Sequence, residues 1–237
     1  MDAGKYREIS LVKLSVKQNC LLCQQSSARL ICDYCRTDLE TFSCAEHQQN
    51  LLNWPKAKRG LKSVKFKTLL ALADYQWPLS RLLTGLKFSA QLSNAKALAQ
   101  LFYQNSLVEL SALPEVIIPM PLHNRRYCQR KFNQSIEIAK HLSQLTGIRL
   151  DTNLLKRIKK TQPQTTLSVA QRKVNLEQAF ALNHGQYLDT QDYTHIVLFD
   201  DVVTTGATMD AAYNLLATTF PASRIDVWCI CLTLEHQ

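Results

Sequence analysis

Four cysteines in two closely spaced pairs lie near the start of the chain. Cys20 and Cys23 form one Cys-x2-Cys pair, and Cys32 and Cys35 form a second pair eight residues later. The short turn within such a pair points both sulfurs the same way, so two pairs can direct four thiolates at one tetrahedral zinc ion. Clustered cysteines in a chain without a secretory signal favour a metal over disulfides. We therefore predict a Zn²⁺ site formed by these four residues.

A third group of potential ligands, Cys44 and His47, follows the two pairs. Six ligands exceed the four that one zinc ion takes and fall short of the eight needed for two separate sites. Cys44 and His47 are therefore alternatives to one of the two pairs. Because the segment is too small to build its own apolar core, we expect the metal to be structural.

A second chemical pattern lies in residues 195–216, where an apolar run ends in Asp200 and Asp201 and is followed by a turn and a helix. In an α/β sheet, ligands bind at the carboxyl ends of the strands, and a helix N-terminus presents unpaired N–H groups with a partial positive charge. A monophosphate fits that position. The turn adds hydroxyl donors, and a glycine that lets the backbone approach the phosphate closely. These residues are Thr204, Thr205, Gly206 and Thr208.

The two acids would repel a phosphate if they faced it. They are better placed to accept hydrogen bonds from vicinal hydroxyls, which lie about a ribose length from a 5′-phosphate. The alternative to a ligand site is a strand that ends in solvent-exposed acids and is followed by an ordinary capped helix. The combination DD-x2-TTG-x-T favours a ribose-5-phosphate site.

Two basic segments are candidates to meet further phosphate groups. In the first, Pro119 and Pro121 stiffen the exit from a strand, and a diphosphate needs the cationic donors that follow. These donors are His123, Arg125, Arg126, Arg130 and Lys131. The second segment, residues 156–166, has few apolar anchors, so it can open and close over a ligand and exclude water. The alternatives are a basic surface loop and an exposed linker, respectively.

The elements that position these groups follow from hydrophobic periodicity. Apolar residues at three- and four-residue spacing predict helices over residues 91–104, 133–145 and 207–220. Short, nearly continuous apolar runs predict buried, parallel strands over residues 115–120, 195–201 and 224–234. Their alternation predicts an α/β domain with a sheet covered on both faces.

Length and composition are those of a folded protein. The chain has 237 residues, of which 46% are hydrophobic and 20% charged. This length allows one substantial core with a small appendage. We expect a zinc-binding module over residues 1–50, a basic connector over 51–70 and the main domain over 71–237. No apolar run approaches the roughly 18–20 residues that span a bilayer, so we expect a cytoplasmic protein without membrane insertion.

The charge is uneven. The chain has 28 basic and 19 acidic residues, a net charge of +9. Residues 56–67 carry six basic and no acidic residues, and residues 123–160 carry ten basic and two acidic ones. Such stretches suit a phosphate-rich partner, either a nucleic acid or a small polyphosphate, although a solvated basic face is the plainer reading.

The segment FDDVVTTGAT, residues 199–208, resembles the signature of type I phosphoribosyltransferases that binds 5-phosphoribosyl 1-diphosphate (PRPP). In that signature the two acids hold the ribose hydroxyls and the TTGAT backbone holds the 5′-phosphate. The resemblance implies that PRPP is bound by Asp200, Asp201, Thr204, Thr205, Gly206, Ala207 and Thr208.

Other blocks are similar to those of the ComF family of competence-associated, phosphoribosyltransferase-like proteins: the N-terminal cysteine module and residues 73–88, 117–135 and 154–180. The resemblance runs from about Cys20 to the last predicted strand. It implies a type I phosphoribosyltransferase-like fold, with a mostly parallel sheet flanked by helices and a small zinc-ribbon-like module. One departure is Lys131, which stands where the family usually has a glycine, so this turn must accommodate a side chain.

The resemblance implies two alternative functions. The first is an enzyme in which Mg²⁺ assists the displacement of diphosphate from PRPP by a nitrogen nucleophile. Type I transferases carry a mobile loop over this site, which makes Arg157, Lys159, Lys160 and Gln164 candidates to meet the diphosphate. The second is a non-catalytic module that senses PRPP or nucleotides. In both cases the family is linked to DNA uptake, natural transformation or use of imported DNA, with single-stranded DNA or a helicase as partner.

Overall fold

The computed structural model describes residues 18–61, 64–122, 130–158, 179–183 and 193–234. The chain divides into two compact units, Met1–Asp38 and Leu39–Gln237. This boundary lies twelve residues before the one we expected, at residue 50. The reason is that residues 39–50 already belong to the second unit: Leu39 and Cys44 are buried, and the Phe42 N–H donates to the carbonyl oxygen of Leu72 at 2.8 Å. The expected connector also joins this core, in which Leu51, Leu61 and Phe66 are buried.

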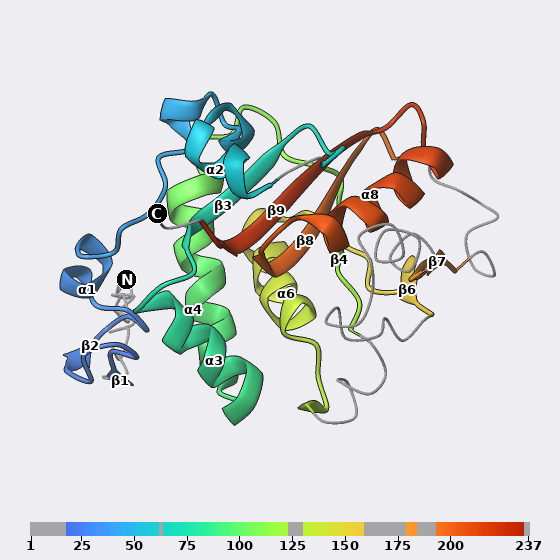
Figure 1. Ribbon diagram of the computed structural model, residues 1–237. Coiled ribbons are helices and arrows are strands. Elements are labelled where there is room, and N and C mark those ends of the chain that lie inside the picture. Colours follow the sequence, from blue (N-terminus) through green and yellow to red (C-terminus); the bar gives the residue numbers. More distant parts are fainter. Residues whose placement is uncertain (1–17, 62–63, 123–129, 159–178, 184–192, 235–237) are drawn as a thin grey trace, which may run out of the picture. The chain divides into compact units, whose positions relative to one another are not determined.

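The described part of the first unit, residues 18–38, contains three short elements (Figure 1): strands β1 (Gln18–Asn19) and β2 (Ser26–Ser27), which form an antiparallel pair, and helix α1 (Asp33–Thr37). Among its described residues, the buried apolar side chains are those of Cys20 and Ile31. So little buried apolar surface does not stabilise a fold of this size, which is why a bound metal would contribute to its stability.

The second unit is built on a five-stranded parallel sheet with the strand order β3-β9-β8-β4-β5. Its strands are β3 (Leu69–Asp74), β4 (Val116–Pro119), β5 (Arg149–Leu150), β8 (His195–Val203) and β9 (Arg224–Leu232). The longer strands are apolar nearly throughout because helices cover both faces of the sheet. The predicted α/β class and the mostly parallel sheet are confirmed.

Neighbouring residues of the central strands pack against different helices, which defines the two faces. Phe199 of β8 and Trp228 of β9 contact the ring of Phe102, at centroid distances of 6.4 and 5.9 Å. Leu198 and Val227 belong to the hydrophobic cluster that includes the helix after β8. Since successive side chains of a strand point to opposite faces, each face of the sheet has its own helical layer.

The first layer contains α3 (Leu79–Ser89), α4 (Leu92–Phe102) and α6 (Gln134–Thr146), and α4 continues into one π-helical turn, η3 (Tyr103–Leu107). The opposite cluster contains α2 (Pro55–Gly60), α8 (Ala207–Thr219) and the antiparallel pair β6 (Leu155–Arg157) and β7 (Phe180–Leu182). Two 3-10 turns, η1 (Ala45–His47) and η2 (Leu51–Asn53), precede α2. Figure 1 shows α3 and α4 side by side.

The predicted helices over 91–104, 133–145 and 207–220 correspond to α4, α6 and α8, and the three predicted strands correspond to β4, β8 and β9. These predictions are confirmed. We did not predict β3 or α3, and the expected connector over 51–70 contains η2, α2 and the first residues of β3. The run Leu69–Ala73 is apolar and buried, a signal for a strand that the neighbouring positive charges obscured.

Candidate functional site

A cavity of about 560 Å³ lies at the carboxyl end of β8. Its lining joins segments that are far apart in the sequence: Asp200–Thr208, Arg130 before α6, and Arg157 in β6. The cavity thus brings together the predicted PRPP-binding residues Asp200–Thr208 with Arg130 and Arg157, whereas Lys131 does not line it. Its lining also includes Tyr75, Lys87 and Gln134, polar residues to which the sequence analysis assigns no role.

The turn after β8 forms one wall of this cavity. Gly206 is the N-cap of α8 and has φ +78°, a left-handed conformation that favours glycine. A Cβ atom here would lie 2.6 Å from Cγ1 of Val64 and 3.1 Å from Cδ2 of Leu61. Space as well as backbone conformation therefore requires glycine. The exposed hydroxyl side chains of Thr204 and Thr205 lie beside the first turn of α8, whose N–H groups have no partner within the helix.

The two acids differ in their surroundings. Strand β8 continues to Val203, two residues beyond the predicted strand, so both acids lie within the strand rather than at its end. Asp200 is half-buried, and its Oδ1 accepts hydrogen bonds from the Ser135 hydroxyl at 2.7 Å and from the Asp201 N–H at 2.9 Å. Asp201 is buried; it forms an ion pair with Lys87, and its Oδ1 accepts a hydrogen bond from Gln134 at 3.1 Å.

Burial, and then the negative charge of Asp201, raise the pKa of Asp200 to about 8. The hydrogen bonds from Ser135 and the Asp201 N–H oppose this shift but do not cancel it. At neutral pH this carboxyl therefore binds a proton readily. A neighbouring cationic ligand or a metal ion would favour its ionised form.

Two arginines contribute positive charge to the cavity. Nη1 of Arg130 donates to Oε1 of Gln134 at 3.1 Å, and the Arg130 guanidinium lies 5.0 Å from the ring centroid of Phe88. The Arg157 guanidinium lies 5.5 Å from the ring centroid of Phe180. These cation–π contacts hold both guanidinium groups at a cavity that the turn Thr204–Thr208 also lines.

Lys131 has φ +61°, so the turn before α6 does accommodate a side chain where the family usually has a glycine. The other predicted cationic and loop residues, His123, Arg125, Arg126, Lys159, Lys160 and Gln164, lie outside the described residues.

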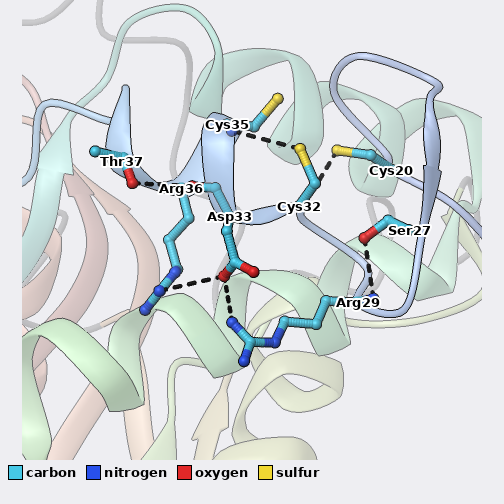
Figure 2. Close-up of polar contacts among 8 residues, drawn as sticks. All are labelled: Cys20, Ser27, Arg29, Cys32, Asp33, Cys35, Arg36 and Thr37. Carbon is cyan, nitrogen blue, oxygen red and sulfur yellow. Dashed lines mark hydrogen bonds and ion pairs between the residues drawn. The ribbon is translucent and has the colours of Figure 1, made fainter.

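The four predicted cysteine ligands lie together in the first unit, and Figure 2 shows three of them, Cys20, Cys32 and Cys35. Their Sγ atoms all lie within 4.8 Å of one another, and those of Cys23 and Cys32 are 3.7 Å apart. A tetrahedral ion with metal–sulfur distances of about 2.3 Å separates its sulfur ligands by about 3.8 Å, so the spacing fits one bound metal. The four thiols therefore could hold a metal ion.

Backbone N–H groups also point at these sulfurs. The N–H of Cys32 donates to Sγ of Cys20, and the N–H of Cys35 donates to Sγ of Cys32, both at 3.4 Å (Figure 2). Burial raises the pKa of the Cys20 thiol, but N–H donors from Cys32, Cys23 and Leu22 outweigh it and lower the pKa to about 6. A thiol that ionises easily is a better metal ligand.

Cys44 and His47, the alternative ligands, belong to the second unit. Sγ of Cys44 is buried and donates to the carbonyl oxygen of Ala71 at 3.8 Å, and burial raises the pKa of this thiol. The ring of His47 stacks on that of Trp54 with centroids 5.3 Å apart. Each therefore has contacts of its own within the second unit, and the cluster of four sulfurs does not include Cys44.

Among the described residues, no helix combines the length and the apolar character needed to cross a membrane.

Fold and site together define an α/β protein with a polar cavity at the strand ends of a parallel sheet and a separate four-cysteine module. No family model matches the chain. The sequence is 37% identical to the "DNA utilization protein YhgH" of Salmonella typhi over 177 residues, 73% of this chain and 75% of that protein. It is 31% identical to "Competence protein F" of Haemophilus influenzae over 201 residues, 83% of this chain and 82% of that protein. The chain belongs to the ComF family.

Two solved structures are also similar, both adenine phosphoribosyltransferases. The enzyme from Leishmania tarentolae matches with 16% identity and a TM-score of 0.37, over 67% of this chain and 73% of that chain. The enzyme from Leishmania donovani matches with 13% identity and the same TM-score, over 72% of this chain and 85% of that chain. Scores this low carry no argument about the fold or the ligand of this protein.

Proposed function

We propose that the second unit binds a 5-phosphorylated ribose, as ribose 5-phosphate or PRPP, in the cavity at the carboxyl end of β8. The observation that supports this most is that one cavity joins the turn Thr204–Thr208 to Asp200, Arg130 and Arg157. A phosphate ester needs the turn and the helix N-terminus, vicinal hydroxyls need a carboxyl acceptor, and a diphosphate needs planar cations.

In this proposal the 5′-phosphate lies against Thr204, Thr205, Gly206, Ala207 and Thr208. Asp200 accepts hydrogen bonds from the ribose hydroxyls, while the Asp201 N–H donates to the Asp200 carboxyl. Arg130 and Arg157 meet the diphosphate, together with His123, Arg125, Arg126, Lys159, Lys160 and Gln164. Mg²⁺ would be held mainly by diphosphate and ribose oxygens and would neutralise charge on the leaving diphosphate.

The experiment for this proposal is calorimetric titration of the full chain with ribose 5-phosphate, and with PRPP and Mg²⁺. The variant Thr205→Val removes one hydroxyl donor to the phosphate, and Thr219→Val makes the same change at the other, exposed end of α8. A hydrogen bond to a charged group contributes about 1.5–3 kcal/mol, so we expect Thr205→Val to weaken binding about 10- to 100-fold. Thr219→Val should bind normally. Absence of binding by the wild-type protein, or equal effects of the two variants, would contradict the proposal.

Diphosphate release from PRPP, measured against a panel of nitrogenous bases, decides between an enzyme and a non-catalytic binding module. Turnover with one acceptor supports a phosphoribosyltransferase. PRPP binding without turnover supports a sensor that uses the same cavity.

We propose that the four-cysteine module holds a structural Zn²⁺ ion, because sulfur ligands at tetrahedral spacing suit zinc and the unit has little buried apolar surface. Metal analysis of protein produced with zinc available tests this directly.

The second candidate function concerns DNA. Relatives named for DNA utilization and competence, and exposed cations on and after α2, favour a role in DNA uptake, transformation or use of imported DNA. In this role the basic surface binds single-stranded DNA, and a helicase or another DNA-uptake protein acts as partner. The exposed, described cations of this surface are Lys58, Arg59, Lys65 and Lys67.

The DNA candidate is tested by fluorescence anisotropy with a labelled single strand at several salt concentrations. Each phosphate neutralised on a single strand contributes about −0.7 to the log–log slope, so Lys65→Gln with Lys67→Gln should flatten the slope by about 1.4. The double control Lys96→Gln with Lys140→Gln removes the same charge from the exposed faces of α4 and α6. If both double variants change the slope equally, the attraction comes from net charge alone.

A further inference from the structure

Lys87, in the last turn of α3, is a cation inside the proposed ligand cavity. Its Nζ forms an ion pair with Oδ2 of Asp201, and the two side chains are only 16% and 5% exposed. The same Nζ lies 5.9 Å from the ring centroid of Tyr75, which also lines the cavity. Lys87 lies in the block of residues 73–88 that resembles the ComF family, but that resemblance assigned it no role.

The second oxygen of Asp201 is engaged as well. Its Oδ1 accepts a hydrogen bond from Nε2 of Gln134, a residue that is 4% exposed, and Oε1 of Gln134 accepts one from Arg130. Asp201 therefore faces α3 through one oxygen and α6 through the other. Asp200, its neighbour in β8, is less buried and lines the same cavity.

The charges explain what this arrangement does. Two adjacent carboxylates repel an anionic ligand, and a buried carboxylate without a partner is costly. Lys87 compensates the charge of Asp201 within the protein, and Gln134 fixes the direction of its carboxylate. The ligand then meets one carboxyl, that of Asp200, instead of two.

We propose that Lys87 is a positioning residue that acts on the ligand through Asp201: it keeps Asp201 as an internal, charge-compensated acceptor and leaves Asp200 as the carboxyl that contacts the ligand hydroxyls. The proposal rests on the proposed binding of a phosphorylated ribose, and it gives the two acids of the motif different roles.

The test is a cycle of variants in the full chain: Lys87→Met, Asp201→Asn and the double variant Lys87→Met with Asp201→Asn. Binding of ribose 5-phosphate is measured by calorimetry at constant pH and low salt. Lys87→Met leaves the charge of Asp201 uncompensated beside an anionic ligand, so we expect its affinity to fall roughly tenfold or more. The double variant is neutral at both positions, so we expect its affinity to return to within about threefold of the wild type. Lys87→Arg keeps the charge and should bind like the wild type.

Two results would overturn the proposal while the proposed function stands. If the double variant binds as weakly as Lys87→Met, Lys87 contacts the ligand itself. If Lys87→Met binds like the wild type, its charge does not act on the site. If the wild-type protein does not bind ribose 5-phosphate, the proposed function fails first and the role of Lys87 fails with it.

A second measurement separates this role from a general loss of folding. Urea unfolding of the wild type, the two single variants and the double variant measures the contribution of the Lys87–Asp201 pair to stability without any ligand. Lys87→Met should lower the unfolding midpoint, and adding Asp201→Asn should raise it again because the uncompensated buried charge is gone. Additive effects of the two substitutions would show that the pair does not act as a unit.

Discussion

Replacing Gly206 with alanine tests the contact between the turn after β8 and residues 61–66, which precede β3. Gly206 has φ +78° and Gly147, at the C-cap of α6, has φ +76°. An added Cβ at Gly147 meets no atom within 4 Å, whereas at Gly206 it would lie 2.6 Å from Val64. Gly147→Ala is therefore a matched control, because both substitutions introduce the same backbone strain and only one introduces a clash.

The expected magnitudes follow from that difference. A left-handed conformation costs a non-glycine residue about 1–2 kcal/mol, which applies at both positions. Overpacking a well-packed site costs about 1–3 kcal/mol more, and this applies at Gly206 only. We expect Gly206→Ala to lower the free energy of unfolding by about 1–3 kcal/mol beyond the effect of Gly147→Ala.

Urea denaturation followed by tryptophan fluorescence measures this difference. The three tryptophans lie in the second unit, and Trp228 is fully buried, so the signal reports on that unit. Adding Val64→Ala to Gly206→Ala removes the clashing methyl and should recover most of the additional loss. Equal effects of the two glycine substitutions, or no recovery with Val64→Ala, would refute the packing of Val64 on this turn.

Three further predictions concern the metal module and the buried carboxyls. Removing zinc with a chelator, or replacing Cys20 with serine, should expose residues 18–38 to protease while the second unit keeps its tryptophan signal, because metal binding there supplies folding free energy; intact residues 18–38 after metal loss would contradict this. Burial raises the pKa of Asp226, but hydrogen bonds from His195 and Arg224 outweigh it and lower the pKa. The contribution of Asp226 to stability is therefore present above its unfolded pKa and lost as pH falls through its folded pKa. When the urea midpoint is plotted against pH, Asp226→Asn should reduce its fall at acid pH. The raised pKa of Asp200 acts in the opposite direction, with stability lost as pH rises from about 4 toward about 8. Asp201→Asn removes one cause of that shift, so carbon-13 titration should show a lower pKa for Asp200, and an unchanged value would mean that burial alone sets it.

The cysteine cluster and the segment around Asp200 could each be found from local sequence, because each is a short contiguous segment. The spacing of Cys20, Cys23, Cys32 and Cys35 already predicts a metal site, since each pair needs only a short turn to align its sulfurs. The run from His195 to Thr208 contains a strand, a turn and a helix start, so its geometry depends mostly on its own residues. The helices and strands with strong periodicity, α4, α6, α8, β4, β8 and β9, were predicted for the same reason.

The connector shows where local sequence misled. Residues 51–70 are rich in lysine, which is typical of a solvated linker. Leu61, Val64 and Phe66 nevertheless lie between those lysines and pack beside Gly206 in the turn after β8. These side chains are buried because they pack against α8 and the residue before it, more than 140 residues later in the chain. No feature of the connector sequence predicts that contact.

The different surroundings of the two acids were decided by tertiary structure alone. Asp200 and Asp201 are chemically identical neighbours, and the sequence treats them as a pair. Their difference arises because parallel strands and two helices bring Lys87 and Gln134 to one acid and Ser135 to the other. The charge and hydrogen-bonding of a carboxyl depend on groups within a few ångströms in space, and in this fold those groups come from positions 65, 67 and 114 residues away in the chain.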